Sequence, residues 1–485
     1  MVNKLFFGLA LLVCCSISWG KSLPNVVLIL VDDMGYGDLG CYNENSKIPT
    51  PHIDSLAEEG MRFTDAHSAG SVCHPSRYGL MTGQLPFRIN YSVWREQPLI
   101  DENRVTVASM LKGEGYRTAM VGKWHLGFKE DGYENRLPGG PVDRGFDTYF
   151  GMRASTDIPP YFYIEGDRAL VEPYESIDAN YSDGWTKIQG AFWREGGIAP
   201  NLQLEDVLPR FTDEAVGVIR DHSRLHGDDP LFLYLAYPAP HTPWLPSEEF
   251  LGSSGASMYG DFMVMVDHMV GRVMKALEES GMEDDTIVLF SSDNGPVWYP
   301  TDVKEFGHDS VEGLSGMKGD AWEGGHRMPF IVRWPGDVKS GSVSDELICF
   351  TDFFATMADV IGREPSSDEG PDSISFLPVL KGRTQGDRES LVLESARGLF
   401  SVRDGKWKYI NGKGSGGFSD GYFKQQKLSN KGPKHQLYNL EEDPGETTNL
   451  AAKHPDVVKR LDRELQRVLK QGFYKTDDAA QTMGK

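Results

Sequence analysis

The chain has 485 residues, of which 39% are hydrophobic and 25% charged, and its formal net charge is −22. This composition is ordinary for a globular protein, and the length predicts one large core with a smaller subdomain. The acidic balance argues against a nucleic-acid-binding protein, which needs a basic face, and it requires a local basic pocket for any anionic substrate.

The N-terminal segment is typical of a secretory signal peptide. Lys4 supplies a positive charge, residues 5–15 form an apolar run, and Ser18 and Gly20 are the small residues of a cleavage site. The run is short for a membrane span, and no other long apolar stretch follows. We therefore expect residues 1–20 to be removed and the mature protein to be secreted or periplasmic, with no membrane span. The alternative is a buried first strand or helix.

Strands and helices alternate up to about residue 365. Continuous apolar runs predict buried strands, and apolar residues at helical spacing predict helices between them. This alternation predicts an α/β fold with a mostly parallel sheet covered by helices on both faces. The predicted strands are 25–31, 118–121, 231–237, 286–291 and 329–334, and the predicted helices are 104–114, 205–221 and 258–279.

Two regions depart from this alternation. Residues 128–204 are rich in Gly, Pro and aromatic residues, which predicts long loops over one end of the sheet. After about residue 365, short strand-like pieces and a final amphipathic helix predict a small antiparallel sheet capped by one helix. We therefore divide the chain into an α/β domain, 21–365, and a C-terminal α+β subdomain, 366–485. The C-terminal predictions are strands at 390–393, 399–402 and 407–410, a mobile Gly- and Ser-rich loop at 412–421, and a helix at 454–472.

Polar residues follow two of the predicted buried strands. Asp32 and Asp33 come after the first strand, and Asp293 and Asn294 come after 286–291. Ligands collect at the carboxyl ends of parallel strands, and these oxygen donors suit Ca²⁺ or Mg²⁺. Adjacent residues on a regular strand point apart, so Asp32 and Asp33 can share one ion only if the strand ends irregularly. Each pair alone could instead be a turn or a helix cap.

Cys73 begins a motif with the pattern C-x-P-S-R-x-x-L-x-T-G, which ends at Gly83. This motif resembles the signature of the sulfatase family, in which the cysteine is oxidised to formylglycine. Further blocks are similar to the family from about residue 24 to about 455. They are Gly115-Tyr116-Arg117-Thr118 with Gly122-Lys123-Trp124-His125-Leu126-Gly127, Pro240-His241-Thr242-Pro243, Gly316-Met317-Lys318-Gly319, and Leu437-Tyr438-Asn439-Leu440 with Asp443-Pro444-Gly445-Glu446.

The resemblance implies an alkaline-phosphatase-like fold, one calcium ion per chain and a maturation enzyme that generates formylglycine from Cys73. The aldehyde hydrates to a geminal diol, one hydroxyl attacks sulfur, and the second expels sulfate. The implied metal ligands are Asp32, Asp33, Asp293 and Asn294, with modified Cys73 beside them. The other implied roles are Arg77 holding the diol, Lys123 and Lys318 binding sulfate oxygens, His241 protonating the leaving oxygen and His125 assisting the diol.

The sequence thus predicts a sulfuric ester hydrolase acting on a sulfated carbohydrate. His308, in a loop before the Lys318 block, is a further candidate for substrate binding. Arg153, Trp185, Trp193 and Arg194 are candidates for a sugar-binding rim. Two alternatives are a phosphate or phosphonate monoester hydrolase of the same superfamily and a non-catalytic protein that binds sulfated glycans.

Overall fold

A computed structural model of the chain describes residues 23–383, 385–425 and 433–471. The predicted signal peptide, residues 1–20, lies outside the described residues. Among the described residues, no helix is both long and apolar enough to span a membrane.

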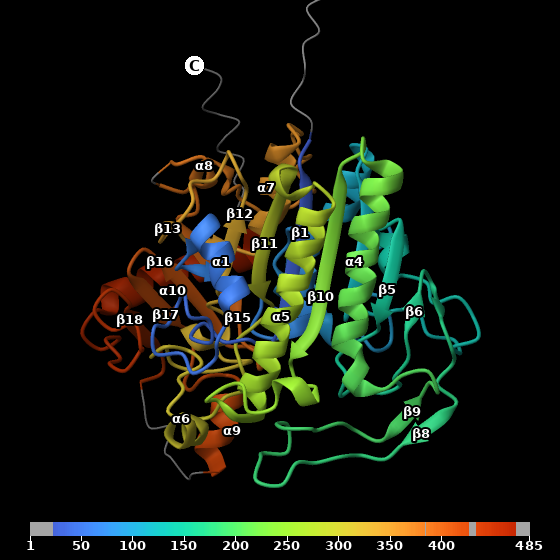
Figure 1. Cartoon of the computed structure of the whole chain (residues 1–485). Helices are drawn as coiled ribbons and strands as arrows, with labels where there is room; N and C mark the ends of the chain where they lie inside the picture. The colour runs from blue at the N-terminus through green and yellow to red at the C-terminus, as the bar shows by residue number, and fades with distance from the viewer. Residues whose placement is uncertain (1–22, 384, 426–432, 472–485) are drawn as a thin grey trace, which may run out of the picture.

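A ten-stranded sheet forms the centre of the molecule (Figure 1). Its strand order is β13-β2-β12-β11-β1-β10-β4-β5-β6-β7, and the central strands from β11 to β5 are parallel. β12 runs antiparallel to β11. The strands are β1 (Asn25–Asp32), β2 (Met61–Phe63), β4 (Arg117–Lys123), β5 (Thr148–Met152), β6 (Ile164–Glu165), β7 (Arg168–Ala169), β10 (Leu231–Pro240), β11 (Thr286–Ser292), β12 (Phe330–Arg333) and β13 (Ser342–Ser344).

Helices cover both faces of this sheet, as the alternation of strands and helices predicted. Alternate residues of the buried strand β1 enter two separate cores, with Leu28 in one and Ile29 in the other. Helices α2, α3 and α7 pack against the Leu28 side, and α1, α4 and α5 pack against the Ile29 side. Their bounds are α1 (Pro51–Glu59), α2 (Cys73–Thr82), α3 (Val107–Gly113), α4 (Val207–His226), α5 (Ser257–Glu279) and α7 (Asp352–Val360).

The C-terminal subdomain is a four-stranded antiparallel sheet covered by one helix, as predicted. Its strands are β15 (Ser390–Glu394), β16 (Phe400–Asp404), β17 (Trp407–Ile410) and β18 (Gln436–Asn439), and its helix is α10 (Pro455–Gln471). Besides short 3-10 helices, the remaining elements of the described residues are α6 (Pro300–Phe306), α8 (Leu377–Leu380), α9 (Phe418–Gln425) and two small sheets. These sheets are β3 (Ala66–His67) with β14 (Ile348–Cys349) and β8 (Glu175–Ile177) with β9 (Gly196–Ile198).

Three predictions about local structure were wrong. Residues 128–204 are not only loops: β5, β6 and β7 extend the main sheet, and Gly151 breaks the apolar run of β5 because a Cβ there would lie 1.9 Å from the Gly122 carbonyl oxygen. The helix predicted from residue 104 begins at Val107, because Thr106 caps it. The segment 412–421 is not simply a mobile loop, since part of it is buried and α9 begins within it.

Candidate active site

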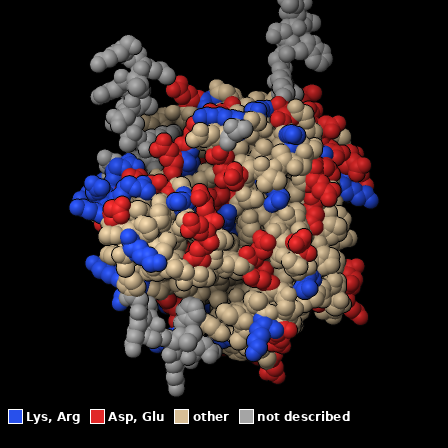
Figure 2. All heavy atoms as spheres, turned by 90° about the vertical axis from the view of Figure 1, so that its left-hand side faces the viewer, with Lys and Arg blue, Asp and Glu red and all other residues tan. Residues whose placement is uncertain are grey.

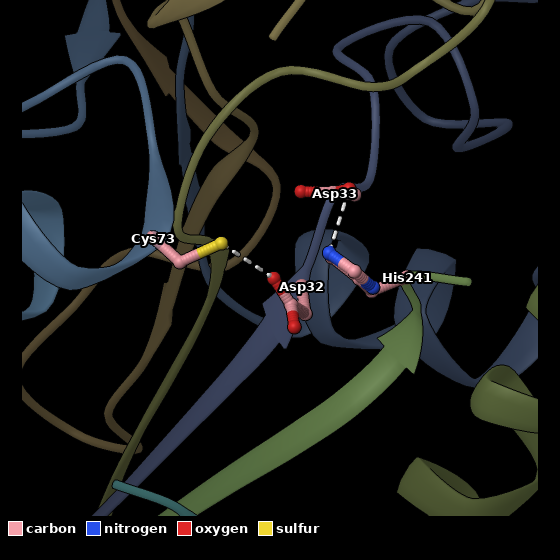
Figure 3. Close-up of side chains that lie close together, drawn as sticks. All are labelled: Asp32, Asp33, Cys73 and His241. Atoms are coloured by element: carbon pink, nitrogen blue, oxygen red, sulfur yellow. Dashed lines mark hydrogen bonds and ion pairs between the residues drawn. The ribbon is translucent and has the colours of Figure 1, made fainter. Parts of the chain in front are cut away.

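The carboxyl ends of four neighbouring parallel strands meet at one edge of the sheet. Asp32 ends β1, Lys123 ends β4, His241 follows β10, and Asp293 follows β11. The sequence therefore brings these side chains together through strand order alone. Cys73 reaches the same edge from the first turn of α2, so its side chain lies beside Asp32 (Figure 3).

The strand β1 ends irregularly, as sharing of one ion by Asp32 and Asp33 requires. Asp33 has a φ of 64°, in the left-handed region that side chains other than glycine rarely adopt. The chain then passes close to Ser310 at Gly35, where a Cβ would lie 1.9 Å from the Ser310 carbonyl oxygen. As a result, Asp32, Asp33, Cys73 and His241 each offer a ligand atom within 4.8 Å of the others.

Cys73 is buried and contacts both a carboxylate and an ammonium group. Its Sγ lies 3.3 Å from Asp32 Oδ1 and 3.4 Å from Lys318 Nζ. Burial and the Asp32 carboxylate raise the pKa of the Cys73 thiol. The unmodified thiol is therefore neutral at physiological pH and a poor nucleophile.

Three buried cations pair with the three carboxylates of the site. Lys123 Nζ lies 2.5 Å from Asp32 Oδ2, Lys318 Nζ lies 2.5 Å from Asp33 Oδ1, and Arg77 Nε donates to Asp293 Oδ2 at 2.8 Å.

The two acids Asp32 and Asp293 differ in pKa. Burial alone would raise the pKa of Asp32, but Lys123, His241 and the other cations hold it well below its usual range. Burial and the neighbouring Asp32 raise the pKa of Asp293 to about 6. This crowding of carboxylates favours a cation.

The two histidines of the predicted site have different environments. Burial and Lys123 lower the pKa of His125 well below its usual value, so its ring is neutral. Neither ring nitrogen of His125 has a hydrogen-bond partner among the described residues. His241 Nδ1 lies 2.6 Å from the Thr242 carbonyl oxygen, and Nε2 lies 3.6 Å from Asp33 Oδ2. Nε2 is therefore the His241 atom that faces the acid cluster.

The structure adds two polar residues that sequence analysis missed. Ser155 and Asp157 follow β5, next to the end of β4, and the His125 N–H donates to the Arg153 carbonyl at 3.0 Å. Ser155 Oγ and Asp157 Oδ1 are buried without a hydrogen-bond partner among the described residues. Asp157 Oδ1 lies 3.9 Å from His241 Nδ1. A prediction of β5 as a strand would have identified them, because strand ends carry the site.

His308 does not join this cluster, which corrects its prediction as a substrate-binding residue. It is fully buried, with Nε2 2.8 Å from Asp38 Oδ1 and Nδ1 accepting from the Lys47 N–H at 3.3 Å. Both ring nitrogens are therefore occupied by protein groups. The Asp38 carboxylate that His308 holds also accepts from the Gly35 N–H at 2.7 Å, so His308 supports the turn after Asp33.

The predicted sugar-binding rim makes internal contacts. Arg153 donates to Glu130 Oε1, Arg194 pairs with Asp157, and the Trp193 indole donates to the Asp178 carbonyl. Trp185 lies against Trp244 and Phe306. The role of these side chains in sugar binding stays a prediction.

The donor set of the acid cluster fits a hard divalent cation. Asp32, Asp33 and Asp293 offer carboxylate oxygens, and Asn294 Oδ1 is buried without a hydrogen-bond partner among the described residues. The Asn294 amide nitrogen donates to Asp33 Oδ1 at 2.6 Å, so the amide lies against the acids. Oxygen-only ligands suit Ca²⁺ or Mg²⁺ better than zinc.

A second buried group lies between the two subdomains. His67, Glu323 and His326 offer ligand atoms within 4.8 Å of one another, and the two His Nδ1 atoms are 2.9 Å apart. Arg403 NH1 and Lys408 Nζ, from β16 and β17, donate to the two Glu323 oxygens at 2.8 and 2.9 Å. No side-chain nitrogen or oxygen of His67, Glu323 or His326 is without a hydrogen-bond partner among the described residues, in contrast to Asn294 Oδ1 in the acid cluster. The group is therefore a structural ion-pair network.

Comparison with known proteins agrees with this geometry. Residues 24–363 match the sequence model of the Sulfatase family, and residues 318–471 match that of the N-sulphoglucosamine sulphohydrolase C-terminal region. The chain is 33% identical to N-acetylgalactosamine-6-O-sulfatase of Bacteroides thetaiotaomicron, over 95% of this chain and 97% of the relative. It is 34% identical to human arylsulfatase A, over 95% of this chain and 89% of the relative.

Solved structures share the fold. A structure from work on the metabolism of multiple glycosaminoglycans by Bacteroides thetaiotaomicron superposes with a TM-score of 0.80 and 31% identity, covering 92% of this chain and 99% of the other. The phosphonate monoester hydrolase of Agrobacterium radiobacter has a TM-score of 0.60 at 20% identity, over 93% of this chain and 96% of the other, which shows the fold alone.

The fold and the acid cluster at the strand ends define a hydrolase of the alkaline phosphatase superfamily. Within that superfamily, the chain belongs to the sulfatase family, and it is a sulfuric ester hydrolase. This confirms the family, fold class and enzyme class that the sequence predicted.

Proposed function

We propose that this sulfatase hydrolyses sulfate esters of carbohydrates outside the cytoplasm, using a formylglycine made from Cys73 and a bound calcium ion. The observation that carries this proposal is the position of Cys73. Its Sγ lies at the start of α2, between Asp32 Oδ1 and Lys318 Nζ, where a sulfate group would meet both the acid cluster and the lysines.

The cofactors would be held by residues already in place. Asp32, Asp33, Asp293 and Asn294 would bind calcium, which supplies Lewis-acid activation of oxygen, while the hydrated formylglycine supplies the attacking hydroxyl. Magnesium is the alternative cation. The apolar run at residues 5–15 supports export from the cytoplasm.

The side chains around Cys73 have complementary tasks. Arg77 orients the residue-73 hydroxyls, and Lys123 and Lys318 bind sulfate oxygens, where charge-assisted donors are strongest. His241, through Nε2, transfers a proton to the leaving oxygen. The neutral His125 receives a proton from the residue-73 hydroxyl, for which its two unpartnered ring nitrogens are suited.

A sulfated carbohydrate is the proposed substrate class. The supporting observation is the full-length similarity to N-acetylgalactosamine-6-O-sulfatase, which makes 6-O-sulfated N-acetylgalactosamine the first compound to test. Human arylsulfatase A is equally similar in identity, so an aryl sulfate belongs in the same test. We also propose the division into domains 21–365 and 366–485. The first family match ends at residue 363, and the second begins at residue 318, within the proposed first domain.

The test is turnover of a panel of defined sulfated sugars, one aryl sulfate, and the matched phosphate and phosphonate esters. We expect the highest kcat/KM on a sulfated sugar. Preference for a phosphate or phosphonate ester would overturn the proposal in favour of the superfamily alternative. Tight binding of sulfated sugars without turnover would indicate the glycan-binding alternative.

Maturation is tested on the peptide that contains Cys73. Conversion of the thiol to an aldehyde lowers the peptide mass by about 18 Da, whereas ordinary cysteine oxidation adds oxygen. We expect this loss in active enzyme. Fully active protein with an unmodified thiol would contradict the mechanism.

A further inference from the structure

The short turn that carries Lys318 is tied to both subdomains. On the side of the main sheet, the Lys318 N–H donates to the Pro296 carbonyl at 2.9 Å, and the Gly319 N–H donates to the Ser71 carbonyl at 2.7 Å. Ser71 lies two residues before Cys73. This half of the anchorage therefore fixes the turn relative to the residue that becomes the nucleophile.

The other half of the anchorage comes from residues about 80 to 100 positions later in the chain. The Ala396 N–H donates to the Gly319 carbonyl at 2.9 Å, and the Phe418 N–H donates to the Lys318 carbonyl at 3.4 Å. The Ala321 N–H donates to the Ser415 carbonyl at 2.7 Å. Backbone groups of the C-terminal subdomain thus contact the turn on both sides of the Lys318–Gly319 peptide.

Asp320 joins these two halves through its side chain. Its carboxylate is fully buried, and Oδ2 accepts from the Met317 N–H at 2.9 Å and from the Ser419 hydroxyl. Oδ1 accepts from the Ser419 N–H at 3.2 Å. Asp320 therefore closes the Met317–Asp320 turn and holds the first turn of α9 against it.

Gly417 allows the closest approach between the two segments. A Cβ at this position would lie 2.1 Å from the Gly319 carbonyl carbon and 2.4 Å from Asp320 Oδ1. Both are atoms of the turn itself. Figure 1 shows α9 beside α6 at the end of the sheet toward which β10 points, and the Tyr299 and Tyr422 rings lie 5.6 Å apart there.

We infer that residues 415–419 of the C-terminal subdomain are positioning residues of the active site, which set where the Lys318 ammonium meets the sulfate group. The inference rests on the proposed function, because it assumes that Lys318 binds sulfate. The Lys318 side chain is 8% exposed, and its Nζ lies 2.5 Å from Asp33 and 3.4 Å from Cys73 Sγ. A displacement of the turn by about 1 Å is enough to cost on the order of 100-fold in a positioned contact.

The test measures binding of inorganic sulfate to the mature, calcium-loaded enzyme by calorimetry, so the readout does not need turnover. Gly417→Ala forces the turn to move, and Ser419→Ala removes only the hydroxyl on Asp320. We expect sulfate binding to weaken about 10-fold or more in Gly417→Ala and a few-fold in Ser419→Ala, by analogy with the loss of a charge-assisted contact. Ser373→Ala is the control, because its buried hydroxyl accepts from the Ala355 N–H at 2.7 Å on α7, in the other part of the fold.

Each variant is also combined with Lys318→Ala in a double-mutant cycle. If residues 415–419 act through Lys318, they cause no further loss of sulfate affinity once Lys318 is removed. Losses that multiply, or a loss equal to that of Ser373→Ala, would overturn the inference while leaving the proposed function intact. Unchanged sulfate affinity in Lys318→Ala itself would overturn the inference together with the sulfate-binding role proposed for Lys318. The proposed reaction is tested separately, by turnover of the ester panel.

Discussion

Two buried groups of histidines and carboxylates occupy this molecule, and proximity alone does not tell them apart. In the first, around Asp32 and Cys73, ligand atoms converge as closely as in the second, around Glu323. The first group keeps buried polar atoms without partners among the described residues, including Asn294 Oδ1 and both His125 ring nitrogens. In the second, every side-chain nitrogen and oxygen of His67, Glu323 and His326 has a partner, with Arg403 and Lys408 binding both Glu323 oxygens. The atoms beside them that lack a hydrogen-bond partner in the described part of the chain, Arg403 Nε and Glu446 Oε1, belong to side chains that are already ion-paired.

The difference shows which observation indicates a ligand. A buried polar atom without a partner is costly, so its persistence indicates that something else satisfies it in the working protein. Ion pairs occur in both groups and therefore do not distinguish them. A group whose atoms are all satisfied within the protein is a structural network, which can be neutral or costly for stability but is strongly destabilised when one partner is removed. The experiments below separate a group that serves chemistry from one that holds two subdomains together.

The largest expected effect is at Cys73. Cys73→Ala removes the proposed precursor of the nucleophile, and we expect kcat to fall on the order of 10⁵-fold or more, as for other residues of a concerted catalytic unit. Cys349→Ala is the matched control, since Cys349 is also a free, buried cysteine. It should leave kcat nearly unchanged. Equal activity of the two variants would remove Cys73 from the mechanism.

The next effect concerns His241. A general acid matters most for a poor leaving group, so His241→Ala should lose about 10²–10⁴-fold on a sugar sulfate and far less on an activated aryl sulfate. The measurement is kcat/KM across leaving groups of different pKa. The activity of His125→Ala should depend less on the leaving group, because the role proposed for His125 is at the diol. An identical loss for good and poor leaving groups in His241→Ala would assign the acid elsewhere.

The second group should respond in stability. Glu323→Ala removes the carboxylate that Arg403 and Lys408 share and leaves Arg403 paired with Asp65 and Lys408 with Glu446. We expect a loss of up to about 3–5 kcal/mol in the free energy of unfolding. Urea unfolding measures this loss. The calcium affinity of the folded variant should equal that of the unsubstituted protein. A loss of calcium binding would show that the two groups are coupled.

Calcium removal should affect the group around Asp32 and leave the group around Glu323 unchanged. At a calcium concentration 100 times its Kd, binding stabilises the folded state by about 2.7 kcal/mol, so chelation should lower Tm and activity together. Asp293→Asn should abolish this response, and Glu323→Ala should retain it. Activity restored only by zinc would refute the oxygen-ligand assignment.

The smallest expected effect is a pH dependence of the Glu323 network. Burial and the neighbouring Glu323 raise the pKa of Glu446 to about 7 from an ordinary value of 4.5. The folded state therefore binds this proton more tightly than the unfolded state, and stability falls as pH rises from about 4.5 to 7. Glu446→Gln should remove this dependence. The free energy of unfolding of Glu446→Gln minus that of the unsubstituted protein should therefore be larger at pH 8 than at pH 5, by on the order of 1 kcal/mol. Parallel stability curves would contradict this.

Much of the fold could be predicted from the pattern of apolar residues within short segments of the sequence. The continuous apolar run of β1 and the helical spacing of α5 predicted buried elements, and the alternation of strands and helices predicted the layers. β5 was missed because Gly151 interrupts its short run, and the orientation of β12 was not predicted. Both depend on pairing between distant segments, which no local pattern records.

Sequence analysis predicted the site residues that lie in recognisable motifs. The structure brings together all of the predicted catalytic and metal-binding side chains, from Asp32 to Lys318, although their roles stay proposals. Ser155 and Asp157 were missed because β5 was missed, and His308 was assigned to substrate although Asp38 engages it. The support of Lys318 by Ser419 could not be read from sequence, because about 100 residues separate them.

The burial of Cys73 indicates that the proposed oxidation takes place before the chain has folded. Its side chain is 4% exposed, enclosed by α2 and the ends of the sheet, so a modifying enzyme cannot reach the thiol in the folded protein. Oxidation must therefore compete with folding. Chains that fold first would be trapped as an inactive population that no later treatment of the native protein converts, and the specific activity of a preparation would report the outcome of that kinetic competition.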